Sequence, residues 1–167
     1  IEAELKKEGV KDSKQLTQKR REFLEKIIKE KAIAFEVIKI SPSEIDSTSE
    51  SGTKLNELEA INFANIINKL NKETEPIKVI VDCPSVTISK WQDFLKTKIN
   101  NLSNLEVICE HKADNNHISA AAASILAKSE REREMDKLKE KYGSKIGSGY
   151  PSDSLTCKFL EEYAHKY

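Results

Sequence analysis

Two short runs of aliphatic residues, separated by one helical pattern, constrain the fold more than any other feature of the chain. The runs are IKVIVD at 77–82 and LEVICE at 105–110. Between them Ile88, Trp91 and Leu95 recur at the spacing of one helix face. Strands joined through a helix are normally parallel, because a parallel connection needs a crossover of about a dozen residues. The segment therefore predicts an α/β fold with at least one parallel pair.

The first half of the chain continues this alternation of helices and strands. The opening residues, from Ile1, have the pattern of a helix tail, and a second helix is predicted up to about Lys31. A β-rich run follows at 32–40, and the Ser- and Gly-containing stretch 41–53 predicts a loop. Another helix is expected over 54–70, before the first aliphatic run.

The C-terminal part is predicted to be mainly helical. A long helix is expected over 120–142 with Ser119 as its N-cap, and a last helix is expected from Cys157 after a loop. Two pairs of opposite charge, Glu130 with Arg133 and Glu134 with Lys137, have the spacing that stabilises a helix surface. We find no internal repeat.

Length and composition predict one soluble domain over residues 1–167. Twenty-eight Lys and Arg balance 28 Asp and Glu, so a nucleic-acid site must come from local clustering of charge. No apolar run approaches the roughly 20 residues that span a bilayer. The three cysteines show no C-x-x-C spacing, which indicates neither a disulfide framework nor a zinc site. We expect a cytoplasmic monomer that does not bind membranes.

Two carboxylates, Asp82 and Asp114, follow the two aliphatic runs. In open α/β sheets, ligand sites lie at the carboxyl ends of strands. Two carboxylates brought together there repel unless a divalent cation joins them, and oxygen ligands favour Mg²⁺ or Mn²⁺ over Zn²⁺. Spacing alone slightly favours the alternative, in which Asp82 caps a turn and Asp114 caps the helix near Ser119.

Neighbouring residues suggest further chemistry, but weakly. His111 and His117 flank Asp114, yet no third nitrogen or sulfur ligand stands at a recognisable spacing, so polar surface histidines are the better interpretation. Cys83 follows Asp82 without a base partner in the sequence, which favours a buried structural thiol over a nucleophile.

Two stretches could contact nucleic acid. Tyr150 stands in GSGYP, where a ring can be presented to a base or sugar, although an ordinary turn explains it equally well. Basic residues gather at a loop-to-helix junction that could hold a phosphate, and a solvated face is the alternative. These are Lys11, Lys14, Lys19, Arg20 and Arg21.

Five stretches occur together in a recognisable order. They are GVKDSKQLT, a strand ending in Asp82, EHKAD, a helix containing AAS, and GSGYPSD. In this order they resemble ribonuclease HII, the type 2 ribonuclease H of archaea, over residues 9 to about 163. SPSEID followed by SGTKLNELE is also similar to the archaeal form.

The resemblance implies a ribonuclease H-like fold and an endonuclease that cuts RNA–DNA hybrids and ribonucleotides embedded in duplex DNA. In that family four acidic residues hold two divalent ions, Mg²⁺ or Mn²⁺. Asp82 and Asp114 match the third and fourth of these residues. Tyr150 matches the tyrosine that senses the 2′-hydroxyl, and Lys14 and Asn56 match positions that contact the nucleic-acid backbone. The resemblance thus favours metal binding over capping.

The sequence also departs from the family pattern. We find no DEAGRG strand, which carries the first two carboxylates, no second strand, and no C-terminal helices of the archaeal members. In the family's strand order, 3-2-1-4-5, the run 32–40 would then be separated from the central pair by a gap two strands wide. Ala121 replaces the first serine of the usual SAAS. We therefore expect a partial domain of low stability without catalytic activity. The alternatives are a non-catalytic nucleic-acid-binding remnant and an unrelated α/β domain.

Overall fold

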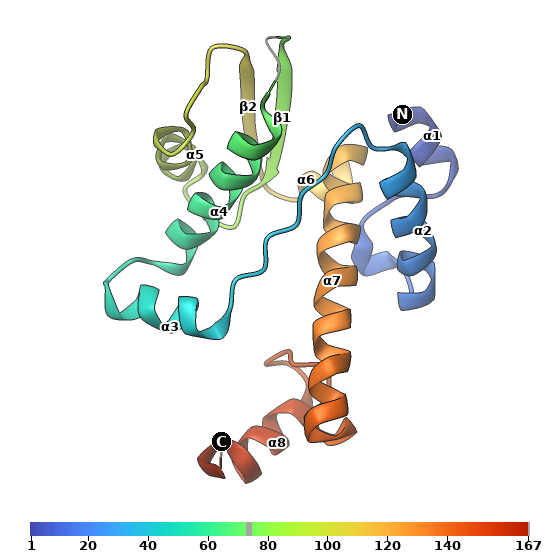
Figure 1. Ribbon diagram of the computed structural model, residues 1–167, viewed down its shortest axis with the longest axis vertical. Coiled ribbons are helices and arrows are strands. Elements are labelled where there is room, and N and C mark those ends of the chain that lie inside the picture. The colour runs from blue at the N-terminus through green and yellow to red at the C-terminus, as the bar shows by residue number, and fades with distance from the viewer. Residues whose placement is uncertain (73–74, 167) are drawn as a thin grey trace. The chain divides into compact units, whose positions relative to one another are not determined.

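The computed structural model describes residues 1–72 and 75–166 (Figure 1). The chain divides into two compact units, Ile1–Leu126 and Ala127–Tyr167. The long helix α7, Ile118–Tyr142, begins in the first unit and continues into the second.

The sheet of the first unit consists of two parallel strands, β1 at Ile77–Asp82 and β2 at Leu105–Glu110 (Figure 1). Ile77 lies opposite Leu105, and the register continues to Asp82 opposite Glu110. The connection contains helix α5, Ile88–Thr97. The predicted parallel pair and its crossover helix are therefore confirmed.

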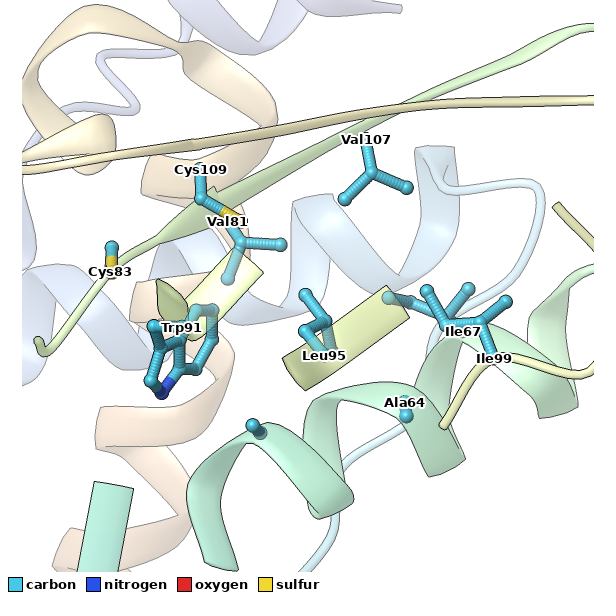
Figure 2. Packing of buried hydrophobic residues seen from close by; sticks show 10 residues of the cluster. Ala64, Ile67, Val81, Cys83, Trp91, Leu95, Ile99, Val107 and Cys109 are labelled. Atoms are coloured by element: carbon cyan, nitrogen blue, oxygen red, sulfur yellow. The ribbon is translucent and has the colours of Figure 1, made fainter. Parts of the chain in front are cut away.

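The larger core of the first unit lies between this sheet and helices α4, Leu55–Leu70, and α5 (Figure 2). Trp91 packs edge-to-face on Phe63, and its ring nitrogen donates a 2.7 Å hydrogen bond to the carbonyl of Asn56. Leu95 is fully buried between the strands and α4. The core residues of this cluster are Ala60, Ala64, Ile67, Val81, Cys83, Trp91, Leu95, Ile99, Val107 and Cys109.

A second core of the same unit joins helices α1, Glu2–Lys7, and α2, Gln18–Lys31, to the beginning of α7. Its buried residues are Leu5, Val10, Leu24, Ile28, Ala121, Ala122, Ile125 and Leu126. The Thr17 hydroxyl caps α2 by accepting from the Arg20 amide. Small side chains on α7 let the helices approach closely, which fixes the start of α7 in the first unit.

The expected strand at 32–40 is not formed, and this prediction is wrong. The segment is extended, yet among the described residues only β1 and β2 pair in a sheet. A strand exists only with a neighbour that accepts its backbone hydrogen bonds, so β propensity alone does not produce one. Val37 instead packs against the second core.

The loop predicted at 41–53 contains helix α3, Pro42–Glu50. The Ser41 hydroxyl accepts from the Glu44 amide, and the Glu44 carboxylate accepts from the Ser41 amide at 2.7 Å. This reciprocal pair is a capping box, and Pro42 has the backbone angle of a first helical residue. The S-P-S-E sequence at 41–44 is the signal for this helix, and the prediction of a loop is wrong.

Two other helix boundaries differ from expectation. Helix α7 begins at Ile118, so Ser119 lies inside the helix and is not its N-cap. Helix α8, Ser154–Tyr163, begins three residues before the predicted position because the Asp153 carboxylate caps it by accepting from the Leu155 amide.

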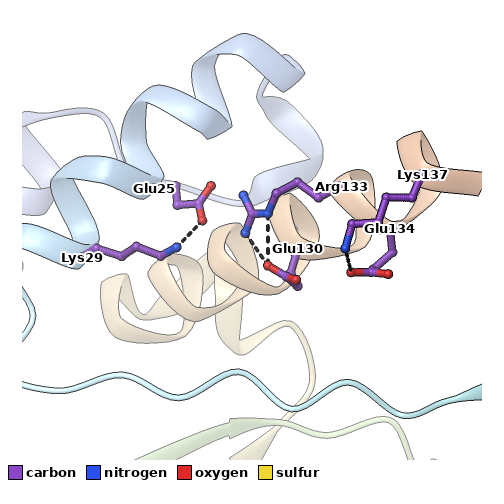
Figure 3. A network of polar contacts seen from close by, with 6 residues as sticks. All are labelled: Glu25, Lys29, Glu130, Arg133, Glu134 and Lys137. Carbon is purple, nitrogen blue, oxygen red and sulfur yellow. Dashed lines mark hydrogen bonds and ion pairs between the residues drawn. The ribbon is translucent and has the colours of Figure 1, made fainter. Parts of the chain in front are cut away.

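Ion pairs within single helices support α2 and α7 (Figure 3). In α2, Lys29 lies 2.6 Å from Glu25. In α7 the two expected pairs are confirmed, with Arg133 at 2.5 Å from Glu130 and Lys137 at 2.9 Å from Glu134. Pairs at this spacing stabilise a helix by about 0.2–0.5 kcal/mol each. In the part of the chain that the structure describes, no helix combines the length and apolar character needed to cross a bilayer.

We predict that Leu95→Ala lowers the free energy of unfolding by about 2–5 kcal/mol, because it opens a cavity in the larger core. Trp91 is the single tryptophan and lies in that core, so its fluorescence during urea unfolding measures the change. Val86→Ala, at a residue that is 95% exposed, is the control and should change the value by less than about 0.5 kcal/mol. Equal effects of the two substitutions would contradict this assignment of the core.

Candidate functional site

Asp82 and Asp114 lie at the same edge of the sheet. Asp82 is the last residue of β1, and Asp114 belongs to α6, Ala113–Asn116, the single helical turn that follows β2. The Asp82 carboxylate accepts a 3.2 Å hydrogen bond from the Ala113 amide. The parallel pairing and this contact bring together the two carboxylates that the sequence analysis singled out.

The Asp114 carboxylate is buried without full compensation of its charge. Its side chain is 4% exposed, and its Oδ1 atom has no hydrogen-bond partner among the residues that the structure describes. Burial raises the pKa of Asp114, the Lys14 ammonium opposes that rise, and the neighbouring carboxylates of Asp12 and Asp82 add to it. The site therefore favours a bound proton or an additional cation.

Asp12 is a member of this cluster that the sequence analysis missed. It is buried, and its carboxylate accepts a 2.9 Å hydrogen bond from the Lys14 amide at the start of a 3-10 turn, Ser13–Gln15. Asp12 stands in the GVKDSKQLT stretch and not at a strand end, so its position in the sequence does not indicate this role. Within residues 1–72 and 75–166, no three His, Cys, Asp or Glu side chains form a group that could hold a metal ion. Asp12 thus adds negative charge to the site without completing a ligand set.

Lys14 is the cation of the site. Its ammonium lies 3.8 Å from Asp114 Oδ2, and its side chain is 72% exposed. The 3-10 turn that carries it is fixed to α7 by a 2.8 Å hydrogen bond between the hydroxyls of Ser13 and Ser124. Lys14 can therefore meet a negatively charged ligand from solvent while its neighbour Ser13 stays buried.

The basic residues near Lys14 do not form one phosphate-binding face. Arg21 is buried and donates to the carbonyl oxygens of Ser13 and Leu16, so it holds the turn from inside. Arg20 donates to the carbonyl of Glu8 and stacks on Phe23. The cluster expected to bind phosphate is thus partly structural.

The histidines beside Asp114 connect α6 to the strand ends. His117 Nε2 lies 3.1 Å from the Glu110 carboxylate, which also accepts from Asn116 at 2.9 Å. His111 Nδ1 lies 3.1 Å from the Cys83 carbonyl. Cys83 itself is buried in the larger core, as expected for a structural thiol. These contacts fix the turn that carries Asp114.

The other two expected substrate-binding residues, Asn56 and Tyr150, have surroundings of their own. Asn56 is exposed at the start of α4, and its carbonyl accepts from Trp91. No contact between its side chain and the two carboxylates occurs in the described residues. Tyr150 belongs to the second unit, in a loop between α7 and α8, and is 41% exposed.

The loop of Tyr150 is held by polar contacts to the start of α8. The Asp153 carboxylate accepts a 2.6 Å hydrogen bond from the Ser148 amide, and the Thr156 hydroxyl accepts from the Gly149 amide at 2.9 Å. The Ser148 hydroxyl, the Ser148 amide and the Leu155 amide together lower the pKa of Asp153 to about 2. The carboxylate is therefore ionised at neutral pH, which keeps the loop closed on the helix.

A model of the family described as Ribonuclease HII matches residues 1–167. The chain belongs to the ribonuclease HII family. Ribonuclease HII from Methanocaldococcus jannaschii is 41% identical over 175 residues, which cover 99% of this chain and 75% of the relative. The matched relatives are named ribonucleases, so the chain is of the ribonuclease H class of enzymes.

Solved structures confirm the ribonuclease H-like α/β fold. The PCNA:RNase HII complex from Archaeoglobus fulgidus matches with a TM-score of 0.85 and 40% identity, over 99% of this chain and 76% of that one. Ribonuclease H2 from Pyrococcus horikoshii OT3 matches with a TM-score of 0.84 and 41% identity, over 99% and 74%. The chain thus spans about three quarters of the length of these ribonuclease HII relatives.

We predict that Asp114→Asn stabilises the protein in the absence of divalent ions, and more at pH 7 than at pH 4. The pKa of Asp114 is higher in the folded protein than in the unfolded chain, so the folded protein holds this proton up to a higher pH. The free energy of unfolding therefore falls as the pH rises from the ordinary carboxyl pKa through the raised one. Asparagine carries no such proton. Urea unfolding in a chelator at both pH values measures the difference, with the exposed Asp46→Asn as control. If the variant is less stable than the wild type at pH 7, the attraction between Lys14 and the Asp114 carboxylate is larger than the cost of burying that charge.

Proposed function

We propose that this chain takes part in hydrolysis of the RNA strand of RNA–DNA hybrids and of ribonucleotides embedded in duplex DNA, with Asp82 and Asp114 as ligands of divalent metal ions. The observation that carries the proposal is the buried Asp114 oxygen, which has no hydrogen-bond partner among the described residues and lies near a second carboxylate at the end of a parallel strand. Membership of the ribonuclease HII family supports the choice of substrate.

The residues of the site fit Mg²⁺ or Mn²⁺. Asp82 and Asp114 offer oxygen donors, which suit these hard cations better than zinc. The family's two ions would supply an activated water and neutralise the charge that develops at the phosphate. In this chain the carboxylates hold the negative charge that attracts the ions, and the exposed ammonium of Lys14 can pair with a phosphate.

Two carboxylates provide only part of the coordination that these ions need. Mg²⁺ requires near-octahedral geometry with six oxygen ligands, and water would have to supply the others. Ions bound in this way dissociate readily. We therefore infer weak metal binding and no cleavage by this chain on its own.

We assign substrate recognition to three residues. Tyr150 is proposed to sense the 2′-hydroxyl, which is the group that distinguishes RNA from DNA. Lys14 and Asn56 are proposed to contact the nucleic-acid backbone, and both are exposed. If the chain binds without cleaving, the same three residues make it a non-catalytic nucleic-acid-binding protein, which is the second candidate function.

We expect the purified chain to bind a duplex with one ribonucleotide more tightly than the same duplex made of DNA, because Tyr150 contacts the additional hydroxyl. Tyr150→Phe should reduce this difference by about 1 kcal/mol, the value of one hydrogen bond. Fluorescence anisotropy with labelled duplexes measures both affinities, and Tyr142→Phe is the matched control.

Cleavage of the same duplexes in Mg²⁺ or Mn²⁺ separates the two candidate functions. Product that survives rigorous removal of host nucleases, and that disappears in Asp114→Asn, would show that the chain is an active nuclease and that our inference of inactivity is wrong. Equal affinities for the two duplexes would exclude ribonucleotide recognition by this chain.

A further inference from the structure

One side chain of α7, Arg131, makes two contacts with the loop that carries Tyr150. Its guanidinium carbon lies 3.7 Å from the centre of the Tyr150 ring. Its Nη2 atom donates a 3.1 Å hydrogen bond to the carbonyl of Ser148, two residues earlier. Both contacts lie within the second unit, so they depend only on the local fold of that unit.

The short distance to the ring centre means that the guanidinium lies over the face of the ring and not at its edge. A planar cation stacks favourably on an aromatic face, where the ring is electron-rich. Arg131 therefore covers one face of Tyr150, while 41% of the residue stays exposed. A ligand that contacts this ring must therefore use its edge, its hydroxyl or its second face.

The backbone that leads into Tyr150 is already fixed. Gly149 has φ +76°, and a Cβ atom there would lie 2.7 Å from Met135 Sδ and 3.3 Å from Arg131 Nη2. At Gly147, with φ +71°, a Cβ would lie 2.6 Å from the Asp153 carboxylate and 2.8 Å from the Thr156 amide. The loop is thus pressed against α7 and α8. The side-chain torsions of Tyr150 are the freedom that remains, and the stack on Arg131 restricts them.

We propose that Arg131 is a positioning residue that sets the specificity of Tyr150 for a ribonucleotide in a duplex. The inference rests on the proposed function, which assigns the sensing of the 2′-hydroxyl to Tyr150. A ring held before binding loses less conformational freedom when the ligand arrives. The contribution of Arg131 therefore appears in discrimination between ribonucleotide and deoxyribonucleotide, and not only in overall affinity.

A direct contact between Arg131 and a phosphate is the competing role, and it makes different predictions. Phosphates are common to both duplexes, so loss of such a contact weakens both affinities by the same factor. Lysine, which also carries a positive charge, would retain most of that contact. A stacked and hydrogen-bonded guanidinium has a planar geometry that lysine does not reproduce.

The test is a double-mutant cycle of Arg131 and Tyr150. The measured quantity is the affinity for a duplex with one ribonucleotide divided by the affinity for the all-DNA duplex. We expect Arg131→Ala to lower this ratio by about 2- to 10-fold, the cost of ordering one side chain. Arg131→Lys should lose most of the same discrimination. In a Tyr150→Ala background, Arg131→Ala should leave the ratio unchanged. Lys137→Ala, on the same helix and paired with Glu134, is the control for lost charge.

A measurement without nucleic acid tests the stack itself. Side-chain protons of Arg131 over the Tyr150 ring should show upfield NMR shifts that disappear in Tyr150→Ala and persist in Tyr150→Phe. Shifts that Tyr150→Ala leaves unchanged would overturn the positioning role. An unchanged ratio in Arg131→Ala, with the shifts present in the wild type, would overturn it as well.

Failure of the proposed function has a separate signature. If the wild-type chain shows the upfield shifts but does not discriminate between the two duplexes, the stack exists and Tyr150 does not sense the ribose. That result would overturn the assignment of Tyr150, and with it the specificity role of Arg131.

Discussion

The buried carboxylate of Asp114 is the constraint on which the site depends. A charge removed from water is unfavourable unless paired, and the Lys14 ammonium lies 3.8 Å from one of the carboxylate oxygens, beyond hydrogen-bond distance. Asp12 and Asp82 add negative charge around it. A divalent cation compensates such a cluster better than one flexible lysine, which is why we assign metal binding to this edge of the sheet.

The fold places this unfavourable charge by means of ordinary packing. Burial of Val81, Val107 and Leu95 fixes two parallel strands against α4 and α5, and parallel strands end at the same edge. The contact from the Ala113 amide to Asp82 then ties α6 to β1. Apolar burial thus provides the free energy that holds two like charges close together.

Elements with a clear hydrophobic period could be predicted from the sequence. Elements and residue roles that depend on contacts with other segments could not. The β1–α5–β2 unit could be predicted because each of its elements has a clear period and a buried face. The extended run at 32–40 has strand propensity without a paired neighbour, and helix α3 was missed because its capping box lies in a polar stretch. Asp12 and Arg131 were missed because their importance comes from contacts with other segments, which spacing does not indicate.

Direct measurement of Mn²⁺ binding tests the central claim, that Asp82 and Asp114 form a site for divalent ions. The free ion has a strong electron paramagnetic resonance signal, and its loss on titration into the protein reports the bound fraction. The account predicts binding by the wild-type chain that Asp82→Asn and Asp114→Asn each abolish, and that the surface substitution Asp46→Asn leaves intact. Equal binding by the wild type and all three variants would contradict the claim.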